Sequence, residues 1–326
     1  MSCDVLCLRP EADFQRVGAT PPTHLRIVYR AWNDPDVAAL MKEARALVIP
    51  AVGPKLPTLL FDETTVKFVQ VTGAGLDRLE LALLKQLGIA VANVPGGSND
   101  AVAEYAVTTA SVLLRRFAWA DAEIRRGHYR DARARMIADS LLGLDGLTVG
   151  VVGFGIIGVA VAGAFHKRGC SILFHDPAPR DPKVADALRA QSCTLDDLLR
   201  AADVVTLHVP LLPQTTGLIG TRELSLMKPG AVLIQASRGG VVDEAALVQA
   251  LKDGKIGGVA VDVYSAEPPA PDHPLLSLEG AAAQRVLLTP HIAGVTRQST
   301  AFLCRSAWHN IERFFSGHKA PRDVVT

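Results

Sequence analysis

Three glycines and one acid are spaced as a dinucleotide-binding turn requires. Gly153, Gly155 and Gly158 form G-x-G-x-x-G after the apolar run Thr148–Val152, and Asp176 follows 18 positions after the last glycine. The first glycine permits a tight turn, the second lets the backbone approach a pyrophosphate, and the third lets a helix pack closely on the strand. The N-terminus of that helix offers phosphates unpaired N–H groups and a partial positive charge. The pattern predicts a bound dinucleotide, with Asp176 accepting hydrogen bonds from the adenosine ribose.

Two other interpretations of this stretch compete. Residues 146–165 form an uncharged run long enough to span a bilayer. Its six glycines and the strand-forming residues at its start disfavour a membrane helix. A glycine-rich turn that binds nothing is disfavoured because strand, helix and acid all stand at the expected spacing. Asp176 favours NAD over NADP, since a carboxylate repels a 2′-phosphate, although Arg180 is close enough in the sequence to reach one.

Three polar residues, Arg238, Glu267 and His291, fall at or just after the ends of later predicted strands. Ligands of doubly wound sheets bind beyond the carboxyl ends of the strands. Taken singly, the three have ordinary explanations: a surface arginine, a turn residue before a proline and a satisfied histidine. Their shared position at the strand ends predicts a single site beside the nicotinamide.

The elements that must hold these residues alternate regularly from Leu147 onward. A helix is predicted over 243–253, because acids occupy its first turn, Lys252 its last turn and Gly254 the position beyond. Six strands with crossovers predict a doubly wound sheet. The predicted strands are 148–152, 171–176, 203–209, 231–236, 258–263 and 286–288.

The first hundred residues show an α/β pattern of their own and predict a second parallel sheet. A helix over 101–116, capped by Asn99-Asp100, leads into the second domain, and a helix over 297–315 packs on that helix or returns to the first domain. The predicted domains are 1–99 plus 296–326, and 100–295. The predicted strands of the first domain are 25–29, 46–49, 66–71 and 89–94, with a helical stretch at 36–44.

Composition and charge are those of an ordinary globular protein. The 326 residues are 49% hydrophobic and 21% charged, with a formal net charge of +1, so neither nucleic acid nor an anionic membrane is expected as a partner. Seven arginines lie within 115–135, but acids and apolar residues interleave, which favours a solvated helix face or a subunit contact. Five scattered cysteines predict thiols in a reducing compartment and no metal site. No secretion signal is visible, so the cytoplasm is expected.

Several segments together resemble the D-isomer-specific 2-hydroxyacid dehydrogenase family. Besides the glycine pattern, the resemblance rests on the segments around Arg238, Glu267 and His291, and on Leu207-His-Val-Pro-Leu-Leu-Pro-Gln-Thr-Thr-Gly217. It also rests on Met227-Lys-Pro-Gly230 and on Asn93-Val-Pro-Gly-Gly-Ser-Asn-Asp-Ala-Val-Ala-Glu104. The implied fold is α/β, with two doubly wound parallel-sheet domains in which a Rossmann NAD-binding domain is inserted into a flavodoxin-like substrate domain.

The resemblance implies a role for each site residue. His291 exchanges a proton with the substrate oxygen while hydride passes to or from NAD(H), and Glu267 fixes the histidine tautomer. Arg238 binds the substrate carboxylate and polarises the carbonyl, and backbone N–H groups of Gly73, Ala74 and Gly75 hold the same carboxylate. The resemblance also implies a small 2-keto or 2-hydroxy acid as substrate and a homodimeric assembly. The expected cofactor-binding residues are Gly153, Gly155, Ile156, Ile157, Gly158, Asp176, Val209 and Pro210 beside the adenine, Ala236, Ser237, Asp262 at the nicotinamide carboxamide, and Gly294.

Two departures from the family pattern affect the prediction. The fourth fingerprint position, often arginine, is Ile156, and the segment 49–55 lacks the arginine of phosphoglycerate-oxidising relatives, for which Lys55 or Arg78 would have to substitute. The alternatives are phosphite-type or formate oxidation on the same fold and a corepressor-like NAD-binding scaffold. Formate enzymes carry glutamine in place of Glu267, which argues against them.

Overall fold

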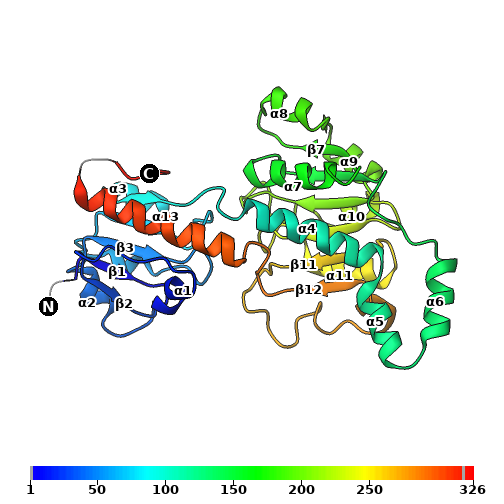
Figure 1. The fold of residues 1–326 in the computed structure, drawn as a ribbon, viewed down its shortest axis with the longest axis horizontal. Coiled ribbons are helices and arrows are strands. Elements are labelled where there is room, and N and C mark those ends of the chain that lie inside the picture. The colour runs from blue at the N-terminus through cyan, green and yellow to red at the C-terminus, as the bar shows by residue number, and fades with distance from the viewer. Residues whose placement is uncertain (1–2, 318–319) are drawn as a thin grey trace. The chain divides into compact units, whose positions relative to one another are not determined.

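The computed structural model describes residues 3–317 and 320–326, which separate into two compact units (Figure 1). The first unit comprises Met1–Ser98 and Val295–Thr326, and the second comprises Asn99–Gly294. The first is therefore discontinuous in sequence, with the whole of the second inserted into it.

The first unit is built on a parallel sheet with the order β2-β1-β3-β4-β5. This is the flavodoxin-like strand order, as predicted. Sequence analysis missed β1, because a buried run of three residues carries no periodic signal of its own. The strands are β1 (Val5–Cys7), β2 (Ile27–Tyr29), β3 (Ala46–Ile49), β4 (Phe68–Val71) and β5 (Ala90–Ala92).

Helices cover both faces of this sheet. Leu6 and Leu47 face the side of α2 (Val37–Met41) and α3 (Leu81–Gln86), whereas Val5 and Val48 face α1 (Glu11–Arg16) and α13 (Arg297–Ser316). A 3-10 helix, η1 (Thr58–Phe61), follows β3. The tail helix α13 packs back on the first unit as predicted, and the ring centroids of Trp308 and Phe14 lie 4.7 Å apart.

The second unit is a seven-stranded parallel sheet with the order β12-β11-β10-β9-β6-β7-β8. This order runs outward in both directions from β6, as in the classic dinucleotide-binding fold, with one additional strand. Six strands were predicted; the two exposed residues of β8 gave no apolar signal. The strands are β6 (Thr148–Val152), β7 (Ser171–His175), β8 (Gln191–Ser192), β9 (Val204–Leu207), β10 (Val232–Gln235), β11 (Gly258–Val261) and β12 (Val286–Leu288).

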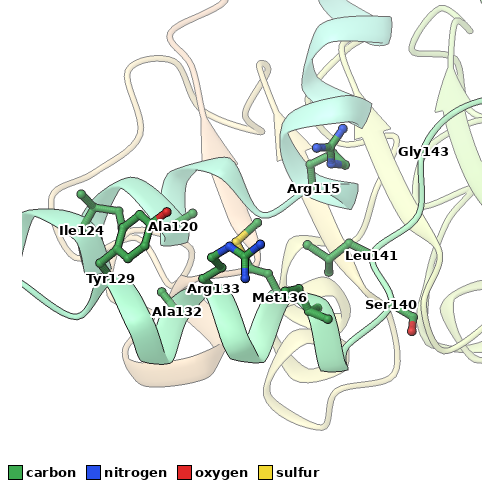
Figure 2. Close-up of a pocket in the computed structure, with 11 residues that line it drawn as sticks. Arg115, Ala120, Ile124, Tyr129, Ala132, Arg133, Met136, Ser140, Leu141 and Gly143 are labelled. Atoms are coloured by element: carbon green, nitrogen blue, oxygen red, sulfur yellow. The ribbon is translucent and has the colours of Figure 1, made fainter.

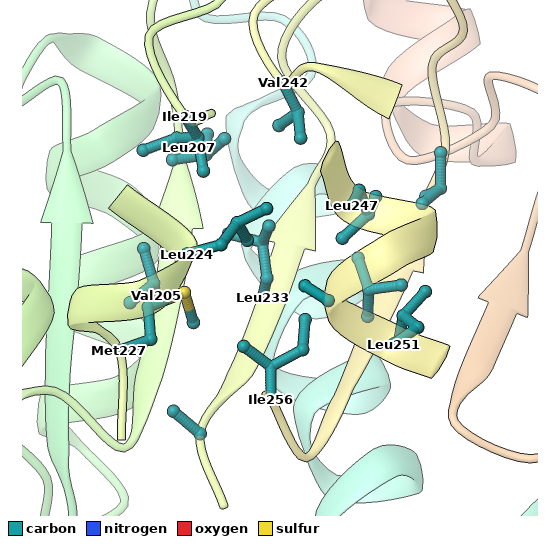
Figure 3. Packing of buried hydrophobic residues seen from close by; sticks show 14 of the residues in the cluster. Val205, Leu207, Ile219, Leu224, Met227, Leu233, Val242, Leu247, Leu251 and Ile256 are labelled. Carbon is teal, nitrogen blue, oxygen red and sulfur yellow. The ribbon is translucent and has the colours of Figure 1, made fainter. Parts of the chain in front are cut away.

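Helices sandwich this sheet as well. One face packs against α4 (Asn99–Leu114) and α7 (Ile156–His166). The other packs against α9 (Leu195–Ala201), α10 (Thr221–Leu226) and α11 (Glu244–Lys252), where Leu207 and Leu233 meet Leu224 and Leu247 (Figure 3). The remaining helices are α5 (Phe117–Arg125), α6 (Tyr129–Ala138), α8 (Pro182–Ala187) and α12 (Gly280–Ala283).

Residues close in the sequence set the start of α11 and the end of α4. Asp243 caps α11, because its Oδ1 accepts hydrogen bonds from the N–H groups of Ala245 and Ala246, both at 3.0 Å. Helix α4 includes Asn99, which was predicted as a cap, and ends at Leu114, two residues before the predicted end. Arg116 has a left-handed backbone with φ of +51° and stacks on Trp119, which separates α4 from α5.

The uncharged run 146–165 is divided between β6, the glycine turn and α7. Across the described parts of the chain, no helix combines the length and apolar character that crossing a bilayer requires.

Candidate active site

The glycine turn lies between β6 and α7, where the strand order of the second unit reverses. Gly153 has φ of +90°, and a Cβ there would overlap the carbonyl oxygen of His208. A Cβ on Gly158 would overlap the carbonyl oxygen of Gly153. A Cβ on Gly155 would meet no described protein atom within 4 Å. Two of the glycines are thus required by the fold, and the third leaves the backbone open to a pyrophosphate.

Asp176 follows β7 and is tied to the same turn. Its Oδ2 accepts hydrogen bonds from the N–H of Phe154 (2.7 Å) and from Arg180 (2.6 Å), and its Oδ1 accepts one from the N–H of Ala178 (2.9 Å). Burial alone would raise the pKa of Asp176, but these hydrogen bonds outweigh it and hold the pKa below its usual value. Asp176 is therefore an anion directly beside the glycine turn.

His291 and Glu267 form a hydrogen-bonded pair after β12 and β11. Nδ1 of His291 lies 2.8 Å from Oε2 of Glu267, and the other carboxylate oxygen accepts the N–H of Tyr264 at 3.1 Å. Both side chains are partly exposed, at 25% and 30%. The pairing directs the Nδ1 proton of the imidazole toward Glu267, which leaves Nε2 for exchange with a substrate.

The loop that carries His291 is organised by Asp262, whose side chain is fully buried. Its Oδ1 accepts hydrogen bonds from Thr289 Oγ1 (2.6 Å) and the N–H of Ile292 (2.8 Å), and its Oδ2 accepts one from the N–H of Ala293 (2.8 Å). Its backbone oxygen accepts the N–H of His291 at 2.8 Å. His291 has φ of +54°, and a sparsely populated backbone of this kind persists only where its surroundings hold it.

Asp262 therefore supports the histidine loop. Its predicted contact with the nicotinamide carboxamide stays a prediction.

Arg238 follows β10, the neighbour of β11 in the sheet. Its backbone oxygen accepts a hydrogen bond from Gln235 Nε2 (2.9 Å), and its Nη1 donates to the carbonyl oxygen of Ser237 (2.7 Å). A Cβ on Gly239 would overlap the carbonyl oxygen of Tyr264. The loops of Arg238 and Glu267 are therefore in direct contact, so the ends of β10, β11 and β12 bring the three predicted catalytic residues to one edge of the sheet.

The other predicted residues lie around this edge or in the first unit. Val209 and Pro210 follow β9, and the side chain of Ile156 is 61% exposed at the start of α7, beside Ile157. Ala236 and Ser237 follow β10, and Gly294 ends the second unit. The loop of Gly73, Ala74 and Gly75 follows β4 of the first unit, and its role in binding substrate stays a prediction.

A family profile described as "D-isomer specific 2-hydroxyacid dehydrogenase, NAD binding domain" matches residues 107–293. The chain belongs to this dehydrogenase family. The match spans the glycine turn, Asp176 and all three residues at the strand ends, so the second unit is the family's NAD-binding domain. The protein is accordingly an NAD-dependent oxidoreductase of the D-2-hydroxyacid dehydrogenase type.

Individual members of the dehydrogenase family are similar over most of this chain. A glyoxylate reductase of Aeropyrum pernix is 35% identical over 82% of this chain and 78% of the relative. A D-3-phosphoglycerate dehydrogenase of Archaeoglobus fulgidus is 37% identical over 72% of this chain, but the match covers only 42% of that longer protein. The crystal structure of D-lactate dehydrogenase from Aquifex aeolicus, complexed with NAD and lactic acid, has a TM-score of 0.82 at 27% identity, covering 96% of this chain and 95% of that one.

Sequence analysis of this dehydrogenase missed several residues that shape the site. Tyr105 on α4 lies 2.8 Å from Thr289, hydroxyl to hydroxyl, and Thr289 donates to Asp262. The two are 184 positions apart, so no local pattern reveals the contact. The one sequence feature that could have indicated a role for Thr289 is its position two residues before His291.

His208 is a further missed residue of the dehydrogenase, located after β9 behind the glycine turn. Its Nε2 lies 2.8 Å from Thr206 Oγ1, and its Nδ1 is buried without a hydrogen-bond partner among the described atoms. Burial lowers the pKa of His208 to about 3. The imidazole is therefore neutral at physiological pH.

Residues 3–317 and 320–326 contain no group of three His, Cys, Asp or Glu side chains that could hold a metal ion. All five cysteines are free thiols.

Proposed function

We propose that this enzyme reduces a small 2-keto acid to the D-2-hydroxy acid and catalyses the reverse oxidation, with His291, Glu267 and Arg238 as its catalytic residues. The hydrogen-bonded pair of His291 and Glu267 at the carboxyl edge of the NAD-binding sheet is the observation that carries the proposal. A histidine oriented by a carboxylate, beside a cofactor site, is suited to proton exchange with a carbonyl or hydroxyl oxygen.

The residues divide the reaction between them. When bound, the cofactor supplies or accepts the hydride. In reduction, the imidazolium of His291 donates its Nε2 proton to the keto oxygen, and Glu267 stabilises the positive charge before that transfer. Arg238 pairs with the substrate carboxylate and stabilises negative charge that develops on the keto oxygen. In oxidation, neutral His291 accepts the hydroxyl proton.

NAD(H) rather than NADP(H) is the proposed cofactor. Asp176 carries a full negative charge at the end of β7, where it would repel a 2′-phosphate and accept hydrogen bonds from ribose hydroxyls. Arg180 is paired with Asp176 at 2.6 Å, so its charge is already engaged by an acid. The open backbone at Gly155 fits a pyrophosphate.

The proposed substrates are small and unphosphorylated, with glyoxylate and hydroxypyruvate as the leading candidates. The glyoxylate reductase of Aeropyrum pernix matches over 82% of this chain and 78% of its own length. Lys55, which would have to bind a phosphate, is paired with Glu80 at 2.7 Å, and Arg78 is only 4% exposed. These contacts argue against a phosphorylated substrate such as phosphoglycerate.

A homodimer through α5 and α6 is the proposed assembly. These helices and the segment that follows expose large apolar side chains, and a groove of about 740 Å³ lies among Ile124, Tyr129 and Met136 (Figure 2). Exposed apolar patches of this kind mark protein contacts. We propose that a second copy of this chain occupies the groove. The proposed location is a reducing compartment such as the cytoplasm, where free thiols persist. Light scattering that shows a monomer at micromolar concentration would contradict the dimer.

The test of function is NADH oxidation, followed by absorbance, with a panel of 2-keto acids. The panel comprises glyoxylate, hydroxypyruvate, pyruvate, phosphohydroxypyruvate, 2-ketoglutarate and a bulky aromatic 2-keto acid. Turnover of the small unphosphorylated acids is expected. Tight NADH binding without turnover of any panel member would overturn the proposal.

A further inference from the structure

Arg78 is a buried cation in the first unit, located between the Gly73–Gly75 loop and α3. Its side chain is 4% exposed, although arginine is almost never buried without a partner. Its Nε donates to the carbonyl oxygen of Pro54 (2.8 Å) and its Nη1 to that of Pro50 (3.0 Å). No ion pair to a carboxylate accompanies these bonds in the described ranges. The guanidinium thus holds both ends of one short loop.

That loop, residues 50–54, follows β3 and is shaped around the guanidinium. Gly53 has φ of +133°, and a Cβ there would lie 3.3 Å from Cζ and Nε of Arg78. The N–H of Leu56 donates to the backbone oxygen of Arg78 at 2.9 Å, and the Leu56 side chain is buried. Backbone and side chain of Arg78 therefore fix the loop from its beginning to its end, while Val52 at its tip is exposed.

The same loop packs against the proposed carboxylate-binding loop. A Cβ on Gly73 would lie 2.5 Å from the Cβ of Ala51, so the two loops are in direct contact there. The Gly73 loop is held on its other side, because Val94 N–H donates to Gly73 O (2.9 Å) and Asn93 Nδ2 donates to Ala74 O (2.7 Å). Ala51 thus completes the support of Gly73, and the bonds of Arg78 to Pro50 and Pro54 set the position of Ala51.

We propose that Arg78 is a positioning residue that determines how tightly this enzyme binds its 2-keto acid. Strands β3 and β4 are parallel neighbours, and loops at the carboxyl ends of such strands are where α/β sheets bind ligands. Arg78 holds the 50–54 loop against Gly73, so that the backbone N–H groups of residues 73–75 keep the geometry that a carboxylate needs. This inference rests on the proposed function.

The experiment compares Arg78→Met and Arg78→Lys with the wild type, and uses Arg16→Met as the matched control. Arg16 is an exposed arginine of the same unit, paired with Asp13 on α1. Hydrogen exchange of the amides in 51–56 and 73–76 reports on the loops. KM and kcat for glyoxylate and hydroxypyruvate report on the substrate, and NADH fluorescence reports on the cofactor.

Arg78→Met is expected to speed exchange in both loops and raise KM at least about tenfold, since two bonds from a charged donor are lost. We expect kcat to change by less than about threefold and NADH affinity to stay constant, because the cofactor residues lie in the other unit. Arg78→Lys keeps the charge but not the forked geometry, so an intermediate KM is expected. Arg16→Met should match the wild type.

If Arg78→Met leaves the KM for both glyoxylate and hydroxypyruvate unchanged, the inference is wrong. A fall in kcat at constant KM would also overturn it. Faster exchange with unchanged KM would make Arg78 a purely structural residue and overturn it as well. Should Arg78→Met fail to fold, the KM of Arg78→Lys decides. If the wild type turns over no 2-keto acid, the proposed function is wrong and this inference falls with it. If the wild type is active and the Arg78 variants have the wild-type KM, only this inference is wrong.

Discussion

Oε2 of Glu267 lies 2.8 Å from Nδ1 of His291, while the other oxygen of the same carboxylate accepts the N–H of Tyr264. Glu267 is therefore held by the backbone on one side and orients the imidazole on the other. The arrangement turns Nδ1 of His291 toward Glu267 and leaves Nε2 for the proposed proton exchange with a substrate.

His291→Ala should abolish turnover and leave NAD affinity nearly intact, since general acid–base catalysis contributes about 10²–10⁴-fold. Glu267→Gln should lower kcat less than His291→Ala, because the amide still orients the ring but no longer stabilises the imidazolium. Steady-state kinetics and NADH fluorescence titration measure both effects. A loss of NADH affinity comparable to the loss of turnover in His291→Ala would instead show a structural role.

Asp262→Asn should impair the histidine loop. One oxygen becomes an NH₂ group, which cannot accept a hydrogen bond from a backbone N–H, so Ala293 or Ile292 loses its acceptor. A buried donor left unpaired costs about 1–3 kcal/mol. We expect a lower unfolding midpoint and a lower kcat. Tyr105→Phe removes only the outer hydroxyl of the same network and should have a smaller effect on both; an effect larger than that of Asp262→Asn would contradict this order.

Gly155→Ala and Gly158→Ala should separate cofactor binding from folding. A Cβ at Gly155 meets open space, so the protein should fold normally and lose NADH affinity. A Cβ at Gly158 overlaps the Gly153 carbonyl, so stability itself should fall. Thermal unfolding and NADH fluorescence compare the two variants. Normal NADH affinity in a folded Gly155→Ala protein would argue that the pyrophosphate binds elsewhere.

Asp176→Ala should erode the preference for NADH over NADPH. The substitution removes the charge that repels a 2′-phosphate. It also releases Arg180 from its ion pair, so that the guanidinium can bind that phosphate. The ratio of kcat/KM for NADH to that for NADPH is the measurement. An unchanged ratio would mean that Asp176 does not face the ribose.

The stability of the second unit should fall on mild acidification because of His208. The pKa of His208 is about 3 in the folded protein and 6.5 in the unfolded chain. Only the unfolded chain therefore gains a proton as the pH drops below about 6.5. The free energy of unfolding is therefore highest above pH 6.5 and falls by about 1.4 kcal/mol per pH unit toward pH 3. Urea unfolding at pH 7.5 and pH 5.5 should show a larger loss for wild type than for His208→Gln. Equal losses would show that the ring is protonated in the fold.

Local sequence determined the parts of this protein whose physics is local. The turn from Gly153 to Gly158 and helix α11 each depend on residues a few positions apart, and Asp176 follows that turn after only one helix and one strand. Spacing and residue type therefore predicted them. Most strands of both sheets were predicted in the same way, since a buried parallel strand is a continuous apolar run. The short strands β1 and β8 were missed, because three buried or two exposed residues contain too little signal.

Tertiary structure alone decided how the site is supported. Asp262 accepts hydrogen bonds from Thr289, Ile292 and Ala293, and the Thr289 hydroxyl lies 2.8 Å from that of Tyr105 on α4. Arg78 bonds carbonyl groups 24 and 28 positions away. A hydrogen bond needs its two atoms within about 3 Å, and only the packing of the sheets places residues this far apart in the chain at that distance.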